Sequence, residues 1–341
     1  MSGIALTKPH WFRWRHMWLP IAVICVAAIG ALVWRPSLLW QPGLRPAAGI
    51  IEYPMLVKTD IPTAVDVAPD GAVWFSVEFS DAIGVFRNGK IERIRKGSQN
   101  FEPLGLAADG AGGAWYTDTS MRAISRIFAD GRIQSFPLPT PIVRLGRLAV
   151  APDGAVWFAD IVTAGVTRLQ DGIYRRHGVG EQGGTPYGIA VDAKGVVWTT
   201  LQGADKLGRL STDGQMTVLD VPTRNGGLGD IAVDRNGAVW FLELRANKIA
   251  RYADGRFTEF LVPTPAAGLT ALATAPDGSV WFTELSAGKL GRLRNGGIKE
   301  FRLPHAGSRP FGVAVNAAND IWYTDLSGWL GMIPATSAKV P

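Results

Sequence analysis

Carboxylate side chains recur at one position of this chain, three residues after a tryptophan that itself repeats every 41 or 42 residues. Carboxylate oxygens are hard ligands of the kind that Ca²⁺ and Mg²⁺ prefer. If the repeat brings these side chains together at one mouth, Glu243, Glu284 and Asp325 are the candidate ligands of a Mg²⁺ or Ca²⁺ ion. The complete set at this position is Asp118, Asp160, Glu243, Glu284 and Asp325.

A structural explanation of the same carboxylates stays open. The segment that follows each tryptophan often carries an arginine, and opposite charges on neighbouring strands form ion pairs. On this interpretation the carboxylates pair with arginines and bind no metal. The arginines concerned are Arg126, Arg168, Arg209, Arg251 and Arg292.

Other polar candidates are few. Arg147 and Asp230 are the only charged residues directly before the innermost apolar stretch of a repeat, and with Tyr187 they are the candidate ligand-binding residues. Each charge could instead be solvated or paired with a neighbour. General base catalysis needs a titratable group aimed at the reacting proton. His305, in "LPHAGSRPFG", is the one histidine on a loop that could reach such a site.

The elements that must position these residues follow from the repeat. Each unit contains four segments rich in β-forming residues, separated by Asp-Gly, Asn-Gly or Pro, which is typical of one four-stranded blade. Glycine, or Asn319 in the last unit, lies three residues before the tryptophan, where a tight hairpin needs positive φ. The tryptophans are predicted to fill the space between blades: Trp74, Trp115, Trp157, Trp198, Trp240, Trp281 and Trp322.

The sequence therefore predicts an all-β, seven-bladed β-propeller over residues 50–334, followed by a tail at 335–341. After Trp322 only one more strand fits, at residues 329–333. The segment "IIEYP" at residues 50–54 is similar to the outer strands "FTEFLVP" and "IKEFRLP". We expect this N-terminal strand to complete the last blade and remove a free sheet edge.

The N-terminal region has a different composition. Residues 17–34 carry no charge and, as a helix, would span roughly 27 Å. The tryptophans that flank them resemble the aromatic belt of a membrane segment, and Lys8, Arg13 and Arg15 favour a cytoplasmic N-terminus. We predict a tail at 1–16, a single transmembrane helix at 17–34 and a linker at 35–49, with a cleaved signal peptide as the alternative. The predicted membrane or partner contacts are Trp11, Trp14, Trp18, Trp34 and Trp40.

Net charge and cysteine content limit the partners. The formal net charge is +6, but residues 1–45 contain five basic and no acidic residues, which leaves 30 basic against 29 acidic in the rest. A near-neutral propeller is an unlikely nucleic-acid partner, since such binding depends on neutralising phosphates. The single cysteine, Cys25, lies in the predicted membrane segment, so no disulfide is expected in the propeller. We expect the propeller on the periplasmic or outer side of the inner membrane, with other membrane protein subunits as partners.

The repeated phrases "DGAVWF", "DGSVWFTE", "GKLGRL" and "FLVPTP" resemble the streptogramin B lyase, or virginiamycin B lyase, family. The resemblance implies a seven-bladed propeller and Mg²⁺-assisted elimination at the ester of a cyclic depsipeptide. It also implies a proline–histidine pair before the innermost strand of the last two blades, one histidine acting as base. Here those histidine positions hold Thr270 and Phe311, and Arg309 replaces the acid before the final pair.

Three functions remain open at this point. The first is a non-catalytic, membrane-anchored binding or scaffold subunit, which the missing histidines favour. The second is a divalent-metal-dependent lyase or lactonase that uses Glu284, Asp325 and His305. The third is a periplasmic ligand sensor that uses Arg147, Tyr187 and Asp230.

Overall fold

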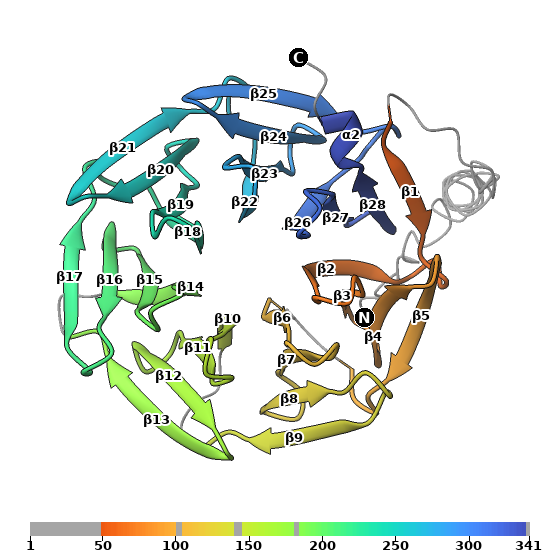
Figure 1. The fold of residues 1–341 in the computed structure, drawn as a ribbon, viewed down its shortest axis with the longest axis horizontal. Coiled ribbons are helices and arrows are strands. Elements are labelled where there is room, and N and C mark those ends of the chain that lie inside the picture. Colours follow the sequence, from red (N-terminus) through yellow and green to blue (C-terminus); the bar gives the residue numbers. More distant parts are fainter. Residues whose placement is uncertain (1–48, 100–103, 140–144, 181–183, 339–341) are drawn as a thin grey trace, which may run out of the picture. The chain divides into compact units, whose positions relative to one another are not determined.

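The computed structural model describes residues 49–99, 104–139, 145–180 and 184–338. The described residues belong to one compact unit. Its described strands make seven four-stranded sheets around a central axis, as Figure 1 shows. The predicted seven-bladed β-propeller is therefore confirmed.

Each blade is an antiparallel sheet whose innermost strand comes first in the chain, except for the last blade, which takes its outermost strand from the N-terminal side. The strands of blades 1 to 4 are β2 (Ile61–Val67), β3 (Val73–Glu78), β4 (Ala82–Arg87), β5 (Lys90–Arg95); β6 (Leu106–Ala108), β7 (Ala114–Asp118), β8 (Ala123–Ile127), β9 (Ile133–Pro137); β10 (Leu145–Val150), β11 (Val156–Asp160), β12 (Gly165–Gln170), β13 (Ile173–Gly178); β14 (Thr185–Val191), β15 (Val197–Gln202), β16 (Lys206–Leu210) and β17 (Met216–Asp220). Those of blades 5 to 7 are β18 (Leu228–Val233), β19 (Val239–Glu243), β20 (Lys248–Ala253), β21 (Arg256–Leu261); β22 (Leu269–Thr274), β23 (Val280–Glu284), β24 (Lys289–Arg294), β25 (Gly297–Arg302); β26 (Pro310–Val315), β27 (Ile321–Asp325), β28 (Trp329–Ile333) and β1 (Ile51–Pro54), with the short helix α2 (Ala335–Ala338) after β28.

The N-terminal strand closes the ring. β1 pairs antiparallel with β28, in a register that places Glu52 opposite Gly331 and Tyr53 opposite Leu330. Figure 1 shows β1 on the outer side of the last blade. The predicted closure is confirmed, and it gives β28 a partner along its outer edge.

The repeating tryptophans pack between blades, as predicted. All seven are buried, with exposed fractions from 0 to 9 %. Trp74 of β3 shares a core cluster with Leu106 and Tyr116 of the next blade. Trp281 of β23 is likewise packed with Tyr323 of β27. An aromatic ring of this size supplies much of the area that each blade buries against its neighbour.

The hairpin between the first two strands of each blade has the predicted backbone conformation. Gly237 has φ of 82° and Asn319, its counterpart in the last blade, has φ of 67°. The Asp234 carboxylate accepts the N–H groups of Asn236 and Ala238 at 2.9 and 3.0 Å. Asparagine tolerates the left-handed conformation better than most other residues, which explains its use where glycine is missing.

The predicted transmembrane helix at residues 17–34 and its flanking tryptophans lie outside the described residues. Within the described ranges, no helix has the length and apolar character that crossing a membrane requires.

Candidate functional site

Buried hydroxyl groups tie the second strand of most blades to the innermost strand. In five blades a serine or threonine two residues after the tryptophan accepts a hydrogen bond from the backbone N–H of a small residue in, or directly before, the innermost strand. In blade 7 only glycine fits, because a Cβ added at Gly312 would lie 2.5 Å from the carbonyl oxygen of Thr63 in the next blade. The hydroxyls are Ser76, Thr117, Thr200, Thr283 and Thr324, and the small residues are Ala64, Gly105, Gly188, Ala271 and Gly312.

Blades 3 and 5 depart from this pattern at both positions. Ala159 and Leu242 stand where the hydroxyl would be, and Arg147 and Asp230 stand where the small residue would be. Both charged side chains line the central channel, which encloses about 340 Å³. The two departures therefore place one cation and one anion in the same channel.

These two charges meet. Arg147 Nε lies 3.0 Å from Asp230 Oδ1, and a second guanidinium nitrogen donates to the carbonyl of Thr270 at 3.0 Å. Asp230 Oδ2 accepts the backbone N–H of Leu272 at 3.0 Å. The pair thus connects blades 3, 5 and 6 across the channel. Burial raises the pKa of Asp230, while the charge of Arg147 opposes the shift.

Tyr187, the third predicted ligand-binding residue, is half-buried in β14, in the blade between those of Arg147 and Asp230. The three candidates therefore come from neighbouring blades, but the two charges are directed at each other. A ligand that binds Arg147 or Asp230 has to compete with this ion pair.

Asp66 is a further acid in the channel that sequence reasoning missed. Its carboxylate accepts the N–H groups of Val67 and Ala108 at 2.8 and 2.9 Å. Burial raises its pKa to about 6 despite these hydrogen bonds. The signal available in the sequence was its position directly after the innermost apolar residue, two places later in the repeat than Asp230.

The predicted ion pairs between the repeated carboxylates and the following arginines are wrong. Trp157 and Asp160 are separated by three residues, an odd number, so their side chains point to opposite faces of the strand. The arginine of the next strand pairs in register with the tryptophan: Arg168 lies opposite Trp157. Its guanidinium instead contacts the hairpin carboxylate of Asp153 at 2.6 Å.

The same arrangement recurs in other blades. Arg126 contacts Asp109 at 2.8 Å and Arg292 contacts Asp277 at 3.2 Å. Each of these two guanidinium groups also lies over the tryptophan of its blade, at 5.6 and 5.8 Å from the ring centre. Arg209 and Arg251 make the same tryptophan contact in blades 4 and 5.

The carboxylates themselves do not converge on one metal position. Asp160 and Asp325 accept backbone N–H groups of the turns that follow them. Asp118 does the same and lies 3.7 Å from Lys96. Among the described residues, no group of three or more histidine, cysteine, aspartate or glutamate side chains could hold a metal ion. Glu243, Glu284 and Asp325 therefore stay separate candidates, one in each of three blades.

Glu243 and Glu284 are buried without hydrogen-bond partners. Both have an exposed fraction of 0 %, and neither carboxyl oxygen of either residue has a partner among the described residues. The lysine opposite Glu284, Lys289, is bonded to Glu300 and Thr264, both at 2.6 Å. Burial, and then the charge of Glu300, raises the pKa of Glu284 to about 7. Burial, and then the charge of Glu259, raises the pKa of Glu243 to about 7.

In the last blade, His305 stands where Thr264 stands in blade 6, beside the glutamate of the outermost strand. Its Nδ1 lies 3.0 Å from Glu52 Oε2, and its Nε2 lies 2.8 Å from Ser327 Oγ and 3.8 Å from Asp325 Oδ2. Tyr323 donates to the other oxygen of Glu52 at 2.6 Å. Burial alone would lower the pKa of His305, but the hydrogen bond and charge of Glu52, with the charge of Asp325, outweigh it and raise the pKa. The imidazole therefore ties the closing strand β1 to blade 7.

We expect the stabilisation that this contact gives to ring closure to depend on pH. Because the pKa of His305 is raised on folding, its contribution is fully present below the unfolded pKa of about 6.5 and is lost as pH rises through the folded pKa. We expect His305→Gln to lower the free energy of unfolding by about 1.5–3 kcal/mol at pH 6, the range for hydrogen bonds to charged groups. The loss should shrink toward pH 9 in urea unfolding curves.

His177→Phe is the matched control for this prediction. His177 belongs to β13, and burial followed by the charges of Arg168 and Arg175 lowers its pKa. His177→Phe should not change the slope of the free energy of unfolding against pH near pH 7, whereas His305→Gln should. The interpretation of His305 as a closure contact is contradicted if His305→Gln costs the same at both pH values.

Sequence reasoning found His305 but missed its partners Glu52, Tyr323 and Ser327. The repeats did contain a signal for Glu52, because "IEY", "TEF" and "KEF" align Glu52 with Glu259 and Glu300. The contact joins residues 253 positions apart, so only ring closure brings them together.

Comparisons with known proteins match the whole propeller to a single protein family. The sequence profile of the virginiamycin B lyase family matches residues 44–171 and 144–336. A virginiamycin B lyase of Nocardia farcinica is 34 % identical over 189 residues, which are 55 % of this chain and 64 % of that protein. The matched region thus spans less than two thirds of that relative.

Solved structures agree on the fold. A catalytically inactive histidine-to-alanine variant of virginiamycin B lyase from Staphylococcus aureus, with quinupristin, has a TM-score of 0.78 and 26 % identity, covering 84 % of this chain and 98 % of that one. A streptogramin B lyase structure has a TM-score of 0.77 at 23 % identity, covering 84 % and 99 % of the two chains, and at that identity it supports the fold alone.

Proposed function

Since this chain belongs to the virginiamycin B lyase family, we propose that it is a non-catalytic binding propeller of that family. In this proposal residues 17–34 anchor it in the inner membrane, and the propeller, on the periplasmic or outer side, acts as a scaffold subunit of a larger membrane protein assembly.

The observation that carries the proposal is the state of the two positions where the family resemblance implies histidines. Phe311 has no titratable group. Thr270 is occupied internally, because its hydroxyl lies 2.7 Å from the Thr283 hydroxyl and 2.7 Å from the Phe311 carbonyl oxygen. An elimination needs a base that takes the proton from the substrate. Neither residue can serve as one.

The residues present also do not fit the Mg²⁺ that the family implies. Arg309, in place of an acid, is exposed, and its backbone N–H donates to Asp325 Oδ2 at 2.9 Å. Asp325 Oδ1 accepts from the backbone and side chain of Ser327. Asp325, with a cation beside it and its oxygens already bonded, is a poor ligand for a hard divalent ion. Glu284 has unbonded oxygens, but among the described residues it belongs to no group of three or more acids, histidines or cysteines that could hold a metal ion. We therefore derive no reaction step through a metal.

Two features of the sequence support the tether and the scaffold role. The uncharged segment at 17–34 has the length and the aromatic flanks of a membrane helix. The rest of the chain, with 30 basic and 29 acidic residues, has no large net charge that would favour nucleic acid. Intramembrane contacts through the flanking tryptophans would then hold the protein in its assembly.

A native gel tests this function. We expect the protein from gently solubilised membranes to migrate within a large assembly whose other subunits mass spectrometry can identify. Replacing Trp11, Trp14 or Trp34 with alanine should reduce the fraction in that assembly more than replacing Tyr187 at the mouth. Migration of the wild-type protein alone would contradict the scaffold role, and equal assembly by the tryptophan variants would contradict the intramembrane contacts.

A second candidate, a lyase or lactonase with a rearranged site, is favoured by one observation. His305 is partly exposed and lies 3.8 Å from Asp325, so a base stands beside an acid of the repeated set. Incubation with quinupristin and Mg²⁺ tests it, with His305→Ala as the control. We expect no ring opening above background. Turnover that His305→Ala abolishes would replace the binding function with the enzymatic one.

The ligand sensor stays a third prediction. The ion pair between Arg147 and Asp230 leaves neither charge unpaired at the mouth, so the structure offers it less support than the first proposal.

A further inference from the structure

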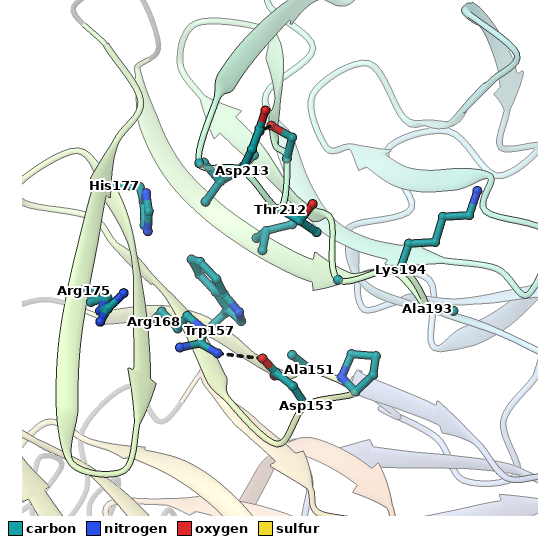
Figure 2. A pocket seen from close by; sticks show the side chains of 16 residues that line it. Ala151, Asp153, Trp157, Arg168, Arg175, His177, Ala193, Lys194, Thr212 and Asp213 are labelled. Carbon is teal, nitrogen blue, oxygen red and sulfur yellow. Dashed lines mark hydrogen bonds and ion pairs between the residues drawn. The ribbon is translucent and has the colours of Figure 1, made fainter.

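A groove between blades 3 and 4 lies beside the hairpin turns that follow the innermost strands β10 and β14. Figure 2 shows it between β13, with Arg175 and His177, and the hairpin turns of blade 4, with Lys194, Thr212 and Asp213. Its volume is about 610 Å³. The indole of Trp157 and the apolar side chains of Val197 and Leu210 are part of its lining.

The other blades show what packing alone needs at the position of His177. In every blade, the third strand has an apolar residue two places before the residue that faces the tryptophan, and one residue of the outermost strand lies opposite it. Only blade 3 carries an imidazole at this outer-strand position. The seven residues are Ile94, Phe136, His177, Leu219, Phe260, Phe301 and Tyr53. The His177 ring lies 5.6 Å from the Trp157 ring, as Phe136 does from Trp115. The imidazole therefore keeps the aromatic contact and adds polar groups that packing does not require.

The charges of the groove are unbalanced on the side of blade 3. Arg168 and Arg175 lie directly opposite each other in the β12–β13 pair, and like charges in that position repel. Asp153 neutralises Arg168, at 2.6 Å. Arg175 has no ion-pair partner among the described residues. The facing turns of blade 4 carry one exposed cation, Lys194, and one exposed carboxylate, Asp213, so the charged lining comprises three cations besides His177 and two carboxylates. A bound anion would offset the repulsion between the two arginines.

The histidine is suited to such a ligand. Burial and then the two arginine charges lower the pKa of His177, which leaves a neutral imidazole at neutral pH. A neutral imidazole donates one hydrogen bond and accepts another. Beside it, the mostly buried Trp157 indole and the blade 4 side chains form an apolar floor.

We propose that this groove is a binding site for a small aromatic anion, whose charged group contacts Arg175 and His177 and whose ring packs toward Trp157. The site goes beyond the proposed scaffold role and does not depend on it, since none of its residues belongs to the mouth or to the predicted membrane segment. Its ligand chemistry is that of an aryl carboxylate.

Calorimetric titration of the full-length chain in a non-ionic detergent tests the site, with naphthalene-2-carboxylate as the probe. We expect saturable binding of one molecule per chain. The neutral naphthalene-2-carboxamide should bind at least tenfold more weakly, and acetate should not bind measurably. Equal heats for the acid and the amide would reduce the result to apolar partition and overturn the proposal.

Variants taken from blade 2 keep the packing intact. Arg175→Gln and His177→Phe install the residues that blade 2 has at these positions, Gln134 and Phe136. We expect Arg175→Gln to weaken probe binding at least tenfold and His177→Phe several-fold, with unchanged thermal unfolding. Lys299→Gln removes the same charge at the equivalent position of blade 6 and should leave binding unchanged. Equal loss with Lys299→Gln would show a general charge effect and overturn the proposal.

An NMR titration separates a binding role from a structural one. The probe should raise the pKa of the His177 imidazole, because a nearby anion favours the protonated form. The resonance is assigned by its absence in His177→Phe. A His177 titration that the probe leaves unmoved would place the anion elsewhere and overturn the proposal.

Discussion

Replacing Arg147 with methionine is expected to lower the free energy of unfolding by about 3–5 kcal/mol, the range for breaking one side of a buried ion pair. The side chains of Arg147 and Asp230 are only 13 and 9 % exposed, so solvent compensates a lone charge poorly. Arg147 also donates to the Thr270 carbonyl, which would lose a partner. Urea unfolding of the full-length chain in non-ionic detergent measures the effect.

The double variant Arg147→Met/Asp230→Leu is the control for this prediction. It removes both charges, and buried ion pairs replaced by apolar residues of similar volume often cost little. We expect it to recover most of the stability lost by Arg147→Met. A cost below about 1 kcal/mol for the single variant would place the pair in the class of solvent-exposed ion pairs.

The Arg147→Met variant should also change how stability depends on pH. Burial raises the pKa of Asp230, and without Arg147 only the backbone hydrogen bonds from Leu272 and Ile231 oppose this effect. The folded protein then holds a proton on Asp230 to higher pH than the unfolded chain does. The single variant should therefore lose stability as pH rises above about 4, more steeply than the wild-type protein.

Glu284→Gln and Glu243→Gln are expected to stabilise the propeller above pH 7, an unusual sign for changes at fully buried positions. Both pKa values are raised to about 7 from 4.5 by burial and a neighbouring glutamate. An acid with a raised folded pKa binds its proton more tightly when folded, so stability falls as pH rises from about 4.5 to 7 and then levels off. Each ionised carboxylate costs on the order of 3 kcal/mol at pH 8.

Glutamine is uncharged at every pH, so each substitution should flatten the decline between pH 5 and 8 in unfolding curves, and the two together should flatten it further. Glu300→Gln is the matched control, since Glu300 is bonded to Lys289 and Thr264. Those contacts outweigh burial and lower its pKa, so its replacement should destabilise the protein. If Glu284→Gln and Glu300→Gln both destabilise at pH 8, Glu284 has a partner in solution that holds it ionised.

Much of the fold could be predicted from local patterns. The spacing of the tryptophans defines the number of blades, and the glycine three residues earlier marks the hairpin. Asn319 could be identified as its substitute because few other residues tolerate positive φ. The similarity of "IIEYP" to two outer strands was enough to predict that β1 pairs with β28.

The candidate site was harder to predict. The carboxylates were correctly found as a repeated set, but their supposed arginine partners lie on the other face of the sheet. The true neighbours of Glu243 are Glu259 on the outer strand and Thr223 on a loop, and Glu284 has Glu300 on the outer strand beside it. The alternation of side chains along a strand would have excluded the arginines, but not identified these neighbours.

By itself, the sequence determined the repeat, the blade number, the turns and the closing strand, because each depends on residues close together in the chain or on an internal copy. It also determined that the histidine positions implied by the family hold Thr270 and Phe311. Only the tertiary structure decided that Arg147 neutralises Asp230 across the channel, that His305 holds Glu52 of the closing strand, and that Glu243 and Glu284 are buried without partners. The contacts of Arg147 and His305 join residues from different blades or from the two ends of the chain, and only the closed ring brings them within hydrogen-bond distance. The two glutamates lose their access to water only when the blades pack.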